Sequence, residues 1–114
     1  ELNQNYIAPQ NPTQELLAEI WSEVLGIERI GIDDNFFYLG GHSLKAIQLI
    51  GQIHKTYELD ITVRHLFNYP TIGELATVLG ELVGGEQIID EISRTIQEIS
   101  QLSPEQVQAM LAQQ

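Results

Sequence analysis

Apolar side chains recur every three to four residues in four separate blocks of this sequence, and this spacing restricts the fold more than any other feature. The first block contains Leu16, Leu17, Ile20, Trp21, Val24 and Leu25. Similar blocks lie within residues 43–56, 74–82 and 88–99. Such spacing is typical of helices that bury one face, and no stretch shows the strict alternation of a half-buried strand. The sequence therefore predicts an all-α protein. The first three blocks and a short third helix near residues 63–67 form a small four-helix bundle, and the fourth block belongs to a C-terminal helical tail.

Prolines, glycines and capping residues divide the chain into segments. Residues 1–12 are polar, contain two prolines and read as a linker from a preceding domain. Asn11 or Thr13 can cap the first helix, and Gly26 suits its end. We expect the bundle to occupy residues 13–83, with helices at about 13–25, 43–56, 63–67 and from Thr71 onward.

The segment 26–42 is too long for an ordinary connection between helices. Loops of this length in small domains are usually functional or internally packed. We expect Phe36, Phe37 and Leu39 to attach it to the core.

Residues 84–114 form a second segment, which begins at the pair Gly84-Gly85. Five isoleucines follow at helical spacing, and they predict an amphipathic helix whose apolar stripe is buried against a packing partner. Ser103 and Gln106 then match a capping box, with a proline at the first helical position between them. The final short helix carries Val107, Met110 and Leu111.

The charge of the chain excludes several functions. The 114 residues include 16 acidic and 5 basic side chains, for a formal net charge of −11. Binding to nucleic acid or to an anionic membrane surface requires clustered Lys and Arg, so we expect neither. The chain has no Cys, which excludes disulfides and thiolate zinc sites and fits the cytoplasm. It starts at a glutamate and looks like a piece of a longer polypeptide.

One serine stands out from the rest of the sequence. In the segment Leu-Gly40-Gly41-His42-Ser43-Leu44, two glycines allow another protein to approach the backbone closely. Ser43 also lies at the predicted start of the second helix, where free N–H groups and the helix dipole favour an anion such as a phosphate ester. From spacing alone, a simple helix cap at Ser43 explains the pattern as well.

Residues 6–83 resemble the peptidyl carrier (thiolation) domains of non-ribosomal peptide synthetases. The resemblance rests on LAEIWSEVLGI, DDNFFYLGGHSLKAIQLI and LFNYPTIGELA. It implies that a phosphopantetheinyl transferase attaches 4′-phosphopantetheine from coenzyme A to Ser43, with Gly40, Gly41 and His42 around the attachment point. The thiol of that arm then holds an aminoacyl or peptidyl group, and the domain itself is not catalytic. The implied partners are an adenylation domain and a condensation or other downstream synthetase domain.

Other functions fit the residues less well. A hydrolase could pair Ser43 with His42, but adjacent residues at a helix start point in different directions, and Lys45 replaces the second glycine of a nucleophile elbow. A metal site built from the three histidines lacks the usual spacing, so we expect no metal. A helical adaptor without a prosthetic group is the alternative from a different class.

The second predicted helix carries two apolar strips. Ala46, Leu49, Ile50 and Ile53 share one face, which should be the core. Leu44, Ile47 and Gly51 lie on a second strip next to Ser43. We expect Leu44 and Ile47 to form a partner surface there unless the preceding loop covers the strip. This helix contains no Asp or Glu. Fatty-acid and polyketide acyl carriers, the nearest alternative, typically show an acidic second helix and an Asp before the serine, whereas this chain has His42.

The tail resembles the C-terminal docking or linker segments of multienzyme synthetases. Three interpretations remain open at this stage: an inter-subunit docking helix, a linker to a further domain, or a helix folded back on the carrier. For the first, we expect Val107, Met110 and Leu111 to contact a downstream subunit.

Overall fold

The computed structural model describes residues 6–112 and, at Val107, the backbone only. The described residues form six α-helices and no strand, which confirms the all-α prediction. The helices are α1 (Pro12–Leu25), α2 (Ser43–Tyr57), α3 (Val63–Asn68), α4 (Ile72–Val83), α5 (Glu86–Ser100) and α6 (Pro104–Ala112).

The starts and ends of the helices follow from local chemistry. Asn11 caps α1, because its Oδ1 accepts the Gln14 backbone N–H at 2.8 Å. Gly26 ends α1 with φ +70°, a left-handed conformation that costs glycine little. Thr71 caps α4 in the same way, since its Oγ1 accepts the Glu74 N–H at 3.2 Å. Of the two predicted caps for α1, Asn11 is thus the actual one, and Thr13 is buried.

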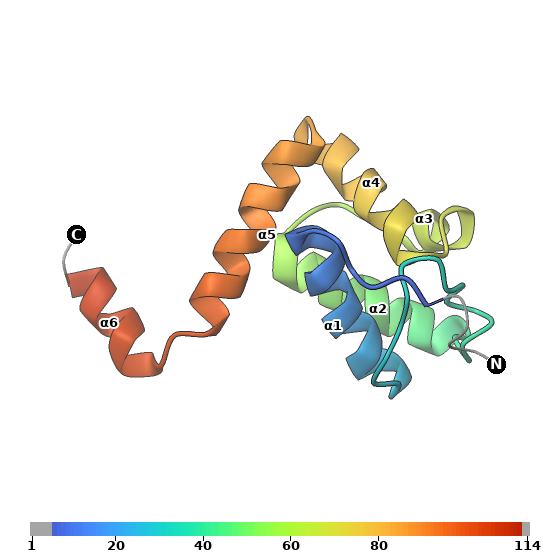
Figure 1. Cartoon of the computed structure of the whole chain (residues 1–114), viewed down its shortest axis with the longest axis horizontal. Coiled ribbons are helices and arrows are strands. Elements are labelled where there is room, and N and C mark those ends of the chain that lie inside the picture. Colours follow the sequence, from blue (N-terminus) through green and yellow to red (C-terminus); the bar gives the residue numbers. More distant parts are fainter. Residues whose placement is uncertain (1–5, 113–114) are drawn as a thin grey trace.

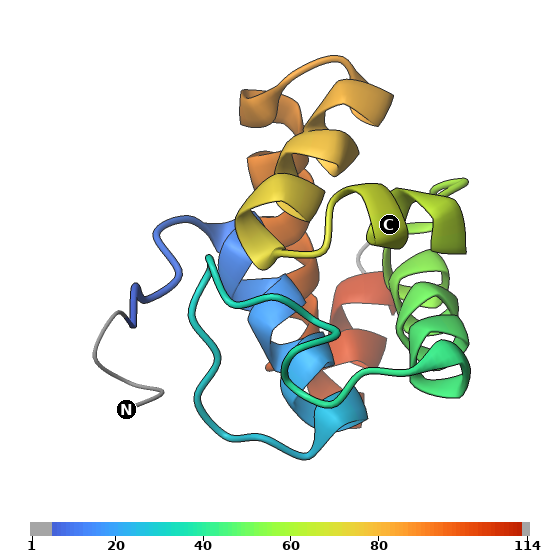
Figure 2. The ribbon, with the colours of Figure 1, turned by 90° about the vertical axis from the view of Figure 1, so that its right-hand side faces the viewer.

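Helices α1, α2 and α4 surround a common core, and the short α3 connects α2 to α4 (Figures 1 and 2). Each of the four helices contributes fully or nearly fully buried apolar side chains. They include Leu17, Trp21, Leu49, Ile53, Leu66, Ile72, Leu75 and Leu79. The bundle therefore has the single core that the sequence predicts for a chain of this size.

The long loop 26–42 is packed internally, as expected. Phe36 is completely buried and meets Trp21 edge-on, with ring centroids 5.2 Å apart. Phe37 and Leu39 are partly buried against the same core. Because three side chains hold it, the loop is a structured part of the bundle rather than a flexible connection.

The described end of the predicted linker lies along this loop. The Ile7 carbonyl accepts the Ile32 N–H at 2.9 Å. The Arg29 guanidinium lies 4.0 Å from the centre of the Tyr6 ring, a cation–π contact. Residues 6–11 therefore contact the bundle, while residues 1–5 lie outside the described part of the chain.

Helix α5 packs against α1 and α4 (Figure 1). Ile89 is 1% exposed and belongs to the main core, and Ser93 is completely buried. Ile92 and Ile96 pack partly on the same cluster. Of the three interpretations left open for the tail, the packed-back helix describes the geometry of α5.

A buried polar network fixes α5 on the bundle. Tyr57 Oη and Ser93 Oγ are hydrogen-bonded at 2.5 Å, and Ser93 Oγ lies 2.9 Å from Thr13 Oγ1. The Thr13 hydroxyl donates to Asp90 Oδ1 at 2.6 Å. Since a carboxylate only accepts, the consistent arrangement runs from Tyr57 through Ser93 and Thr13 to Asp90. The network joins α1, α2 and α5, and its geometry specifies how α5 sits.

We expect a Tyr57→Phe variant to lose about 0.5–1.5 kcal/mol of unfolding free energy, because the buried Ser93 hydroxyl loses a hydrogen-bond partner. The same variant should change how the free energy of unfolding depends on pH in the alkaline range. Burial, together with the nearby Asp90 charge, raises the pKa of Tyr57 from 10.0 to about 12 in the folded protein, although the hydrogen bond between Tyr57 and Ser93 opposes the shift.

Because the pKa of Tyr57 is higher in the folded protein, neutral Tyr57 contributes fully to the free energy of unfolding below pH 10. This contribution is lost as the pH rises toward about 12. Urea unfolding of both proteins across this range is the test. The wild-type protein should lose stability more steeply than Tyr57→Phe. If the unfolding free energies of the two proteins fall equally with pH, Tyr57 is not the cause of the alkaline loss of stability.

Helix α6 begins with the predicted capping box. Ser103 Oγ accepts the Gln106 N–H at 3.2 Å, and Gln106 Oε1 accepts the Ser103 N–H at 2.8 Å. The helix extends away from the bundle at the end of α5 (Figure 1). Within residues 6–112, no helix has the length and apolar character needed to cross a membrane.

Candidate functional site

Ser43 is the first residue of α2 and is exposed. The cap position belongs to His42, whose backbone is extended and whose side chain makes no capping bond. Among residues 6–112, no hydrogen bond involves the Ser43 hydroxyl. The simple-cap explanation of Ser43 therefore does not describe the structure, and the hydroxyl is available to a partner.

The start of α2 lacks the side-chain acceptor found at α1 and α4. The first intrahelical bond runs from the Ala46 N–H to the His42 carbonyl at 2.8 Å, and the first turn contains no acidic residue. The N–H groups of Ser43, Leu44 and Lys45 precede that bond and have no intrahelical acceptor. Together with the helix dipole they favour an anion at this end, so the residues present fit a phosphate ester on Ser43.

The two glycines before the site have different structural roles. Gly40 has φ +107° and open space around it, so it makes the sharp turn that glycine tolerates best. A Cβ on Gly41 would overlap the Phe36 ring and lie 2.7 Å from the carbonyl oxygen of Phe36. Gly41 thus lets the chain pass directly over a buried aromatic ring. The sequence indicated close approach by a partner, whereas the structure adds an internal reason for this glycine.

The core positions the site through the loop. The Phe36 N–H donates to the Pro70 carbonyl at 2.8 Å, and the Phe36 carbonyl accepts the Gly41 N–H at 3.0 Å. Asn35 Oδ1 accepts the Phe37 N–H at 2.8 Å and stiffens the turn. The loop runs from the end of α1 and returns to the start of α2 (Figure 2). Ser43 is therefore presented by a rigid support.

The second strip of α2 is open to solvent. Leu44 and Ile47 are each 59% exposed, and a Cβ at Gly51 would meet nothing within 4 Å. The loop 26–42 therefore does not cover this strip. The opposite face is buried through Ala46, Leu49, Ile50 and Ile53, as the periodicity predicted.

Three exposed aromatic side chains were not identified from the sequence. Tyr38 is 89% exposed, Phe67 55% and Tyr69 42%. The Phe67 ring stacks on Phe37 with centroids 4.9 Å apart, so one of its faces is occupied. Their sequence signal is weak, because an aromatic residue by itself does not show whether its side chain is buried.

The histidines do not form a catalytic or metal-binding group. His54 Nδ1 lies 3.0 Å from the Leu59 carbonyl, and His65 Nδ1 accepts the Thr62 N–H at 2.9 Å. Across residues 6–112, no three His, Asp or Glu side chains are grouped to hold a metal ion. Over the same range, no hydrogen bond joins His42 to Ser43 or to a carboxylate.

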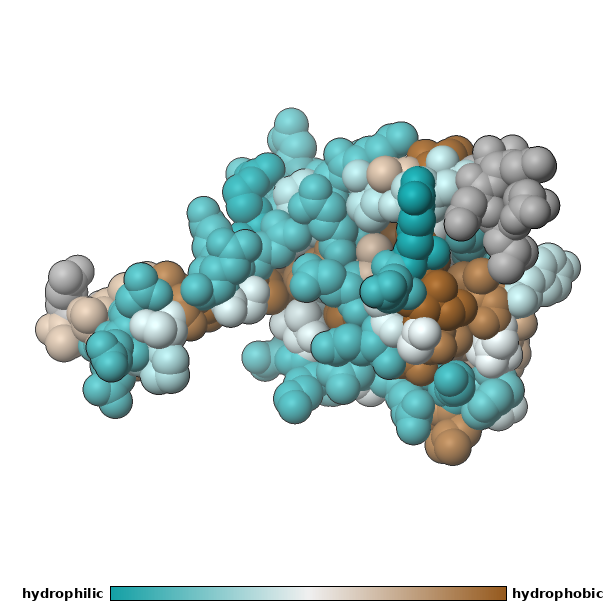
Figure 3. Space-filling view, turned by 60° about the horizontal axis from the view of Figure 1, so that its bottom comes forward, coloured by the Kyte–Doolittle hydropathy of each residue, from teal (hydrophilic) through white to brown (hydrophobic). Residues whose placement is uncertain are grey.

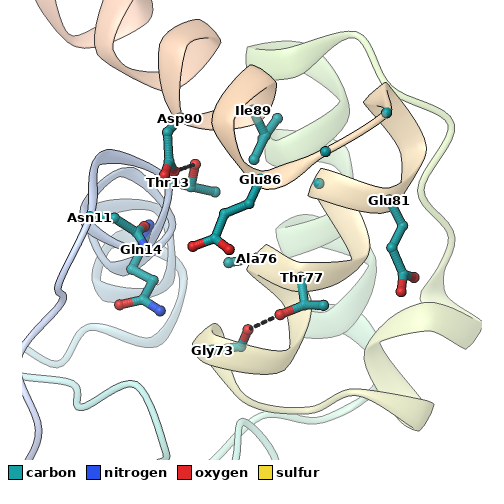
Figure 4. A pocket seen from close by; sticks show the side chains of 13 residues that line it. Asn11, Thr13, Gln14, Gly73, Ala76, Thr77, Glu81, Glu86, Ile89 and Asp90 are labelled. Atoms are coloured by element: carbon teal, nitrogen blue, oxygen red, sulfur yellow. Dashed lines mark hydrogen bonds between the residues drawn. The ribbon is translucent and has the colours of Figure 1, made fainter.

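A cavity lies elsewhere, among α1, α4 and α5 (Figure 4). It has a volume of about 460 Å³, and its lining includes Thr13, Ala76, Glu86, Ile89 and Asp90. Neither Ser43 nor its neighbours contribute to it. Ser43 thus presents an exposed hydroxyl on the surface and is not part of this cavity.

The predicted docking residues of the tail lie on α6. Met110 is 53% exposed and Leu111 61%, while the Val107 side chain lies outside the described residues. The structure also exposes two isoleucines of α5 that the sequence placed in a single buried stripe. Ile88 is 45% exposed and Ile99 52%.

Comparisons with known proteins agree with this geometry. A family profile described as "Phosphopantetheine attachment site" matches residues 15–79. Tyrocidine synthase 3 from Brevibacillus parabrevis is 53% identical over 76 residues, which cover 67% of this chain and 1% of that protein. The chain spans 1–2% of the length of the first curated relatives that it matches.

Two solved structures are similar in fold and sequence. One is the complex of the phosphopantetheine transferase Sfp with coenzyme A and a peptidyl carrier protein, with 47% identity, a TM-score of 0.64, and coverage of 65% of this chain and 96% of the other. The second is the solution structure of a non-covalent extended docking domain complex of the Pax NRPS, PaxA T1-CDD with PaxB NDD. It shows 33% identity and a TM-score of 0.64, and covers 97% of this chain and 92% of the other.

Proposed function

The chain belongs to the phosphopantetheine-attachment family as a peptidyl carrier domain, and we therefore propose that Ser43 is the residue that carries 4′-phosphopantetheine. The observation that supports Ser43 most strongly is its position. It is an exposed hydroxyl at a helix start without a side-chain cap, inside the matched region 15–79. Gly40, Gly41 and His42 form the surroundings of the attachment point.

In this function the domain supplies a hydroxyl and a binding surface, and a separate transferase supplies the catalysis. Ser43 Oγ would take the phosphopantetheinyl group from coenzyme A as a phosphate ester, the pyrophosphate bond of coenzyme A would break with adenosine 3′,5′-bisphosphate as the leaving group, and the hydroxyl proton would pass to the transferase. The N–H groups at the start of α2 would stabilise the resulting anion. The attached group contributes a terminal thiol that holds an aminoacyl or peptidyl thioester. The chain is then non-catalytic, a carrier that moves intermediates between the domains of a non-ribosomal peptide synthetase.

We propose that the partners are a phosphopantetheinyl transferase, an adenylation domain and a condensation or other downstream domain. The complex of a similar carrier with Sfp and coenzyme A supports the first of these. Since attachment draws on coenzyme A, we place the carrier in the cytoplasm. In the proposed division of the chain, residues 1–12 link to a preceding domain, 13–83 form the carrier and 84–114 form a helical tail.

We propose further that the tail docks on a downstream synthetase subunit, with Val107, Met110 and Leu111 in contact with a groove of basic character. The similarity to the Pax docking complex supports this, because it extends over 97% of the chain and thus includes the tail. The exposure of Met110 and Leu111 on a helix that extends from the bundle supports it as well.

The strip beside Ser43 gives a testable prediction. We expect Leu44→Glu and Ile47→Glu to slow loading of the carrier by its partner adenylation domain by at least about tenfold, because a charge must be buried in the interface. The melting temperature should change little, since both side chains are more than half exposed. Thermal melts and single-turnover loading rates of the phosphopantetheinylated variants measure both effects.

A suitable control is Gln48→Glu, which adds the same charge at an exposed position on the same helix. It should load at nearly the wild-type rate. A large loss of stability in the two variants, with unchanged loading per folded molecule, would show that Leu44 and Ile47 are core residues.

A further inference from the structure

We propose that α5 carries a docking seam of its own, to which a basic amphipathic helix of the downstream subunit binds. The inference rests on the proposed docking function of the tail and extends it from α6 to α5. It concerns the side of α5 that the bundle leaves uncovered.

The seam has the spacing of a two-stranded coiled coil. Ile88, Ile92, Thr95 and Ile99 follow one another at intervals of four, three and four residues. Side chains with this spacing form one narrow stripe along a helix, and they can insert between the side chains of a second helix. Ile88 is 45% exposed, Ile99 is 52% exposed and Thr95 is also exposed.

The bundle holds α5 by a neighbouring face. Ile89 and Ser93 are buried against the carrier, and Ile92 and Ile96 pack on it in part, so Ile92 lies at the border between the carrier and the seam. Gln97 Nε2 also donates to Glu15 Oε1 at 3.1 Å. One side of the seam is therefore occupied by the carrier itself. Apolar side chains remain visible along the part of the tail that joins α6 to the bundle (Figure 3).

Two glutamates border the other side of the seam. Glu91 and Glu98 are seven residues apart, both exposed, and each directly precedes a seam isoleucine in the sequence. In a coiled coil these are positions whose charges select the partner. The single basic residue of α5 is Arg94, which lies on another part of the helix surface. The seam therefore favours a helix with an apolar stripe and Lys or Arg opposite the two glutamates.

A second copy of this chain fits the seam poorly. In an antiparallel pair, Glu91 and Glu98 would face the same glutamates of the other copy, which is unfavourable. In a parallel pair, they would face the side of α5 where the carrier already packs. The seam thus selects a different chain of opposite charge.

The length of α5 also bears on the affinity. Its 15 residues give about two heptads, and coiled coils of that length are marginal alone. The exposed Met110 and Leu111 of α6 follow in the same segment and add apolar contact area. We therefore expect both helices to be needed for full affinity.

The test uses the full chain and, as the probe, the fluorescein-labelled N-terminal segment of the synthetase subunit that accepts the intermediate from this carrier. Fluorescence anisotropy measures binding of the probe to the wild-type chain and to Glu91→Lys/Glu98→Lys. The charge reversal should weaken binding by at least about tenfold, and most of the wild-type affinity should disappear at high salt. The matched control, Glu19→Lys/Glu23→Lys, makes the same change of charge on α1 and should bind as the wild type does.

Two further variants separate this inference from the proposed docking function. Ile88→Ser/Ile99→Ser removes the apolar seam, and a chain ending at Ser100 removes α6. If the truncation abolishes binding while both α5 variants bind normally, the tail docks through α6 alone and the seam is refuted. If none of the changes affects binding, the docking function itself is wrong. If both double charge reversals weaken binding equally, net charge rather than the seam is responsible, which also overturns the inference.

Discussion

A Ser43→Ala variant is expected to lose phosphopantetheine attachment completely and to keep its fold. No other hydroxyl in the described chain lies at the turn made by Gly40 and Gly41, so no substitute site exists there. The hydroxyl of Ser43 makes no hydrogen bond within the described residues, and the cap position belongs to His42. The change in unfolding free energy should therefore stay within about 0.5 kcal/mol.

The matched control is Ser103→Ala. Ser103 is also an exposed serine at a helix start, but it forms a capping box with Gln106. This variant should be modified as fully as the wild type. Intact mass after incubation with coenzyme A and a phosphopantetheinyl transferase, together with thermal melts, measures both properties. Attachment to Ser43→Ala, or its loss in Ser103→Ala, would contradict the assignment.

The second large effect is expected from Gly41→Ala. The new methyl group would overlap the Phe36 ring and would lie 2.7 Å from the Phe36 carbonyl oxygen. Phe36 cannot move aside easily, because it is completely buried against Trp21. Overpacking of this kind costs about 1–3 kcal/mol, and here backbone must also shift, so we expect the upper part of that range. Thermal unfolding should occur roughly 5–15 °C lower.

Gly51→Ala provides the control for this prediction. Gly51 lies inside α2, and its new methyl group would meet no atom within 4 Å apart from its chain neighbours and the backbone of its own helix, so alanine should stabilise the helix by about 0.5–1 kcal/mol. Opposite shifts of the two melting temperatures are thus expected. If Gly41→Ala melts at the wild-type temperature, Phe36 does not restrict the loop as described.

Phosphopantetheine attachment to the Gly41→Ala variant should also be slower than to the wild type, because the displaced loop changes the start of α2.

The sequence predicted the helices well where periodicity and capping residues agree. The positions of α1, α2 and α4 followed from their apolar faces, and the capping box of α6 followed from Ser103 and Gln106. Anchoring of the loop by Phe36 also followed from the pattern, since a large aromatic residue in a long loop is costly to expose.

Contacts between distant parts of the chain could not be predicted. Thr13 was a candidate cap, yet it is buried because Asp90 and Ser93, far along the sequence, bind its hydroxyl. The steric requirement at Gly41 depends on where the Phe36 ring lies in space. The pattern of apolar residues predicts neither the burial of Thr13 nor the steric requirement at Gly41.

The isoleucines of α5 show the same limit. Their stripe predicted burial against something, but the structure divides it between the carrier and solvent. Ile89 is in the core, whereas Ile99 is half exposed. The division is set by the polar network around Ser93, whose members are small or polar residues on three helices. For the candidate site, Ser43 was identified from its motif, whereas the absence of a cap at α2 was seen only in the structure.

We propose Ser43 as the attachment residue of this peptidyl carrier domain. The most direct measurement is tandem mass spectrometry of the wild-type chain after incubation with coenzyme A and a phosphopantetheinyl transferase. We predict one added phosphopantetheine per chain, with fragment ions that place it on Ser43. An unmodified chain, or a group located on any other residue, would contradict the claim.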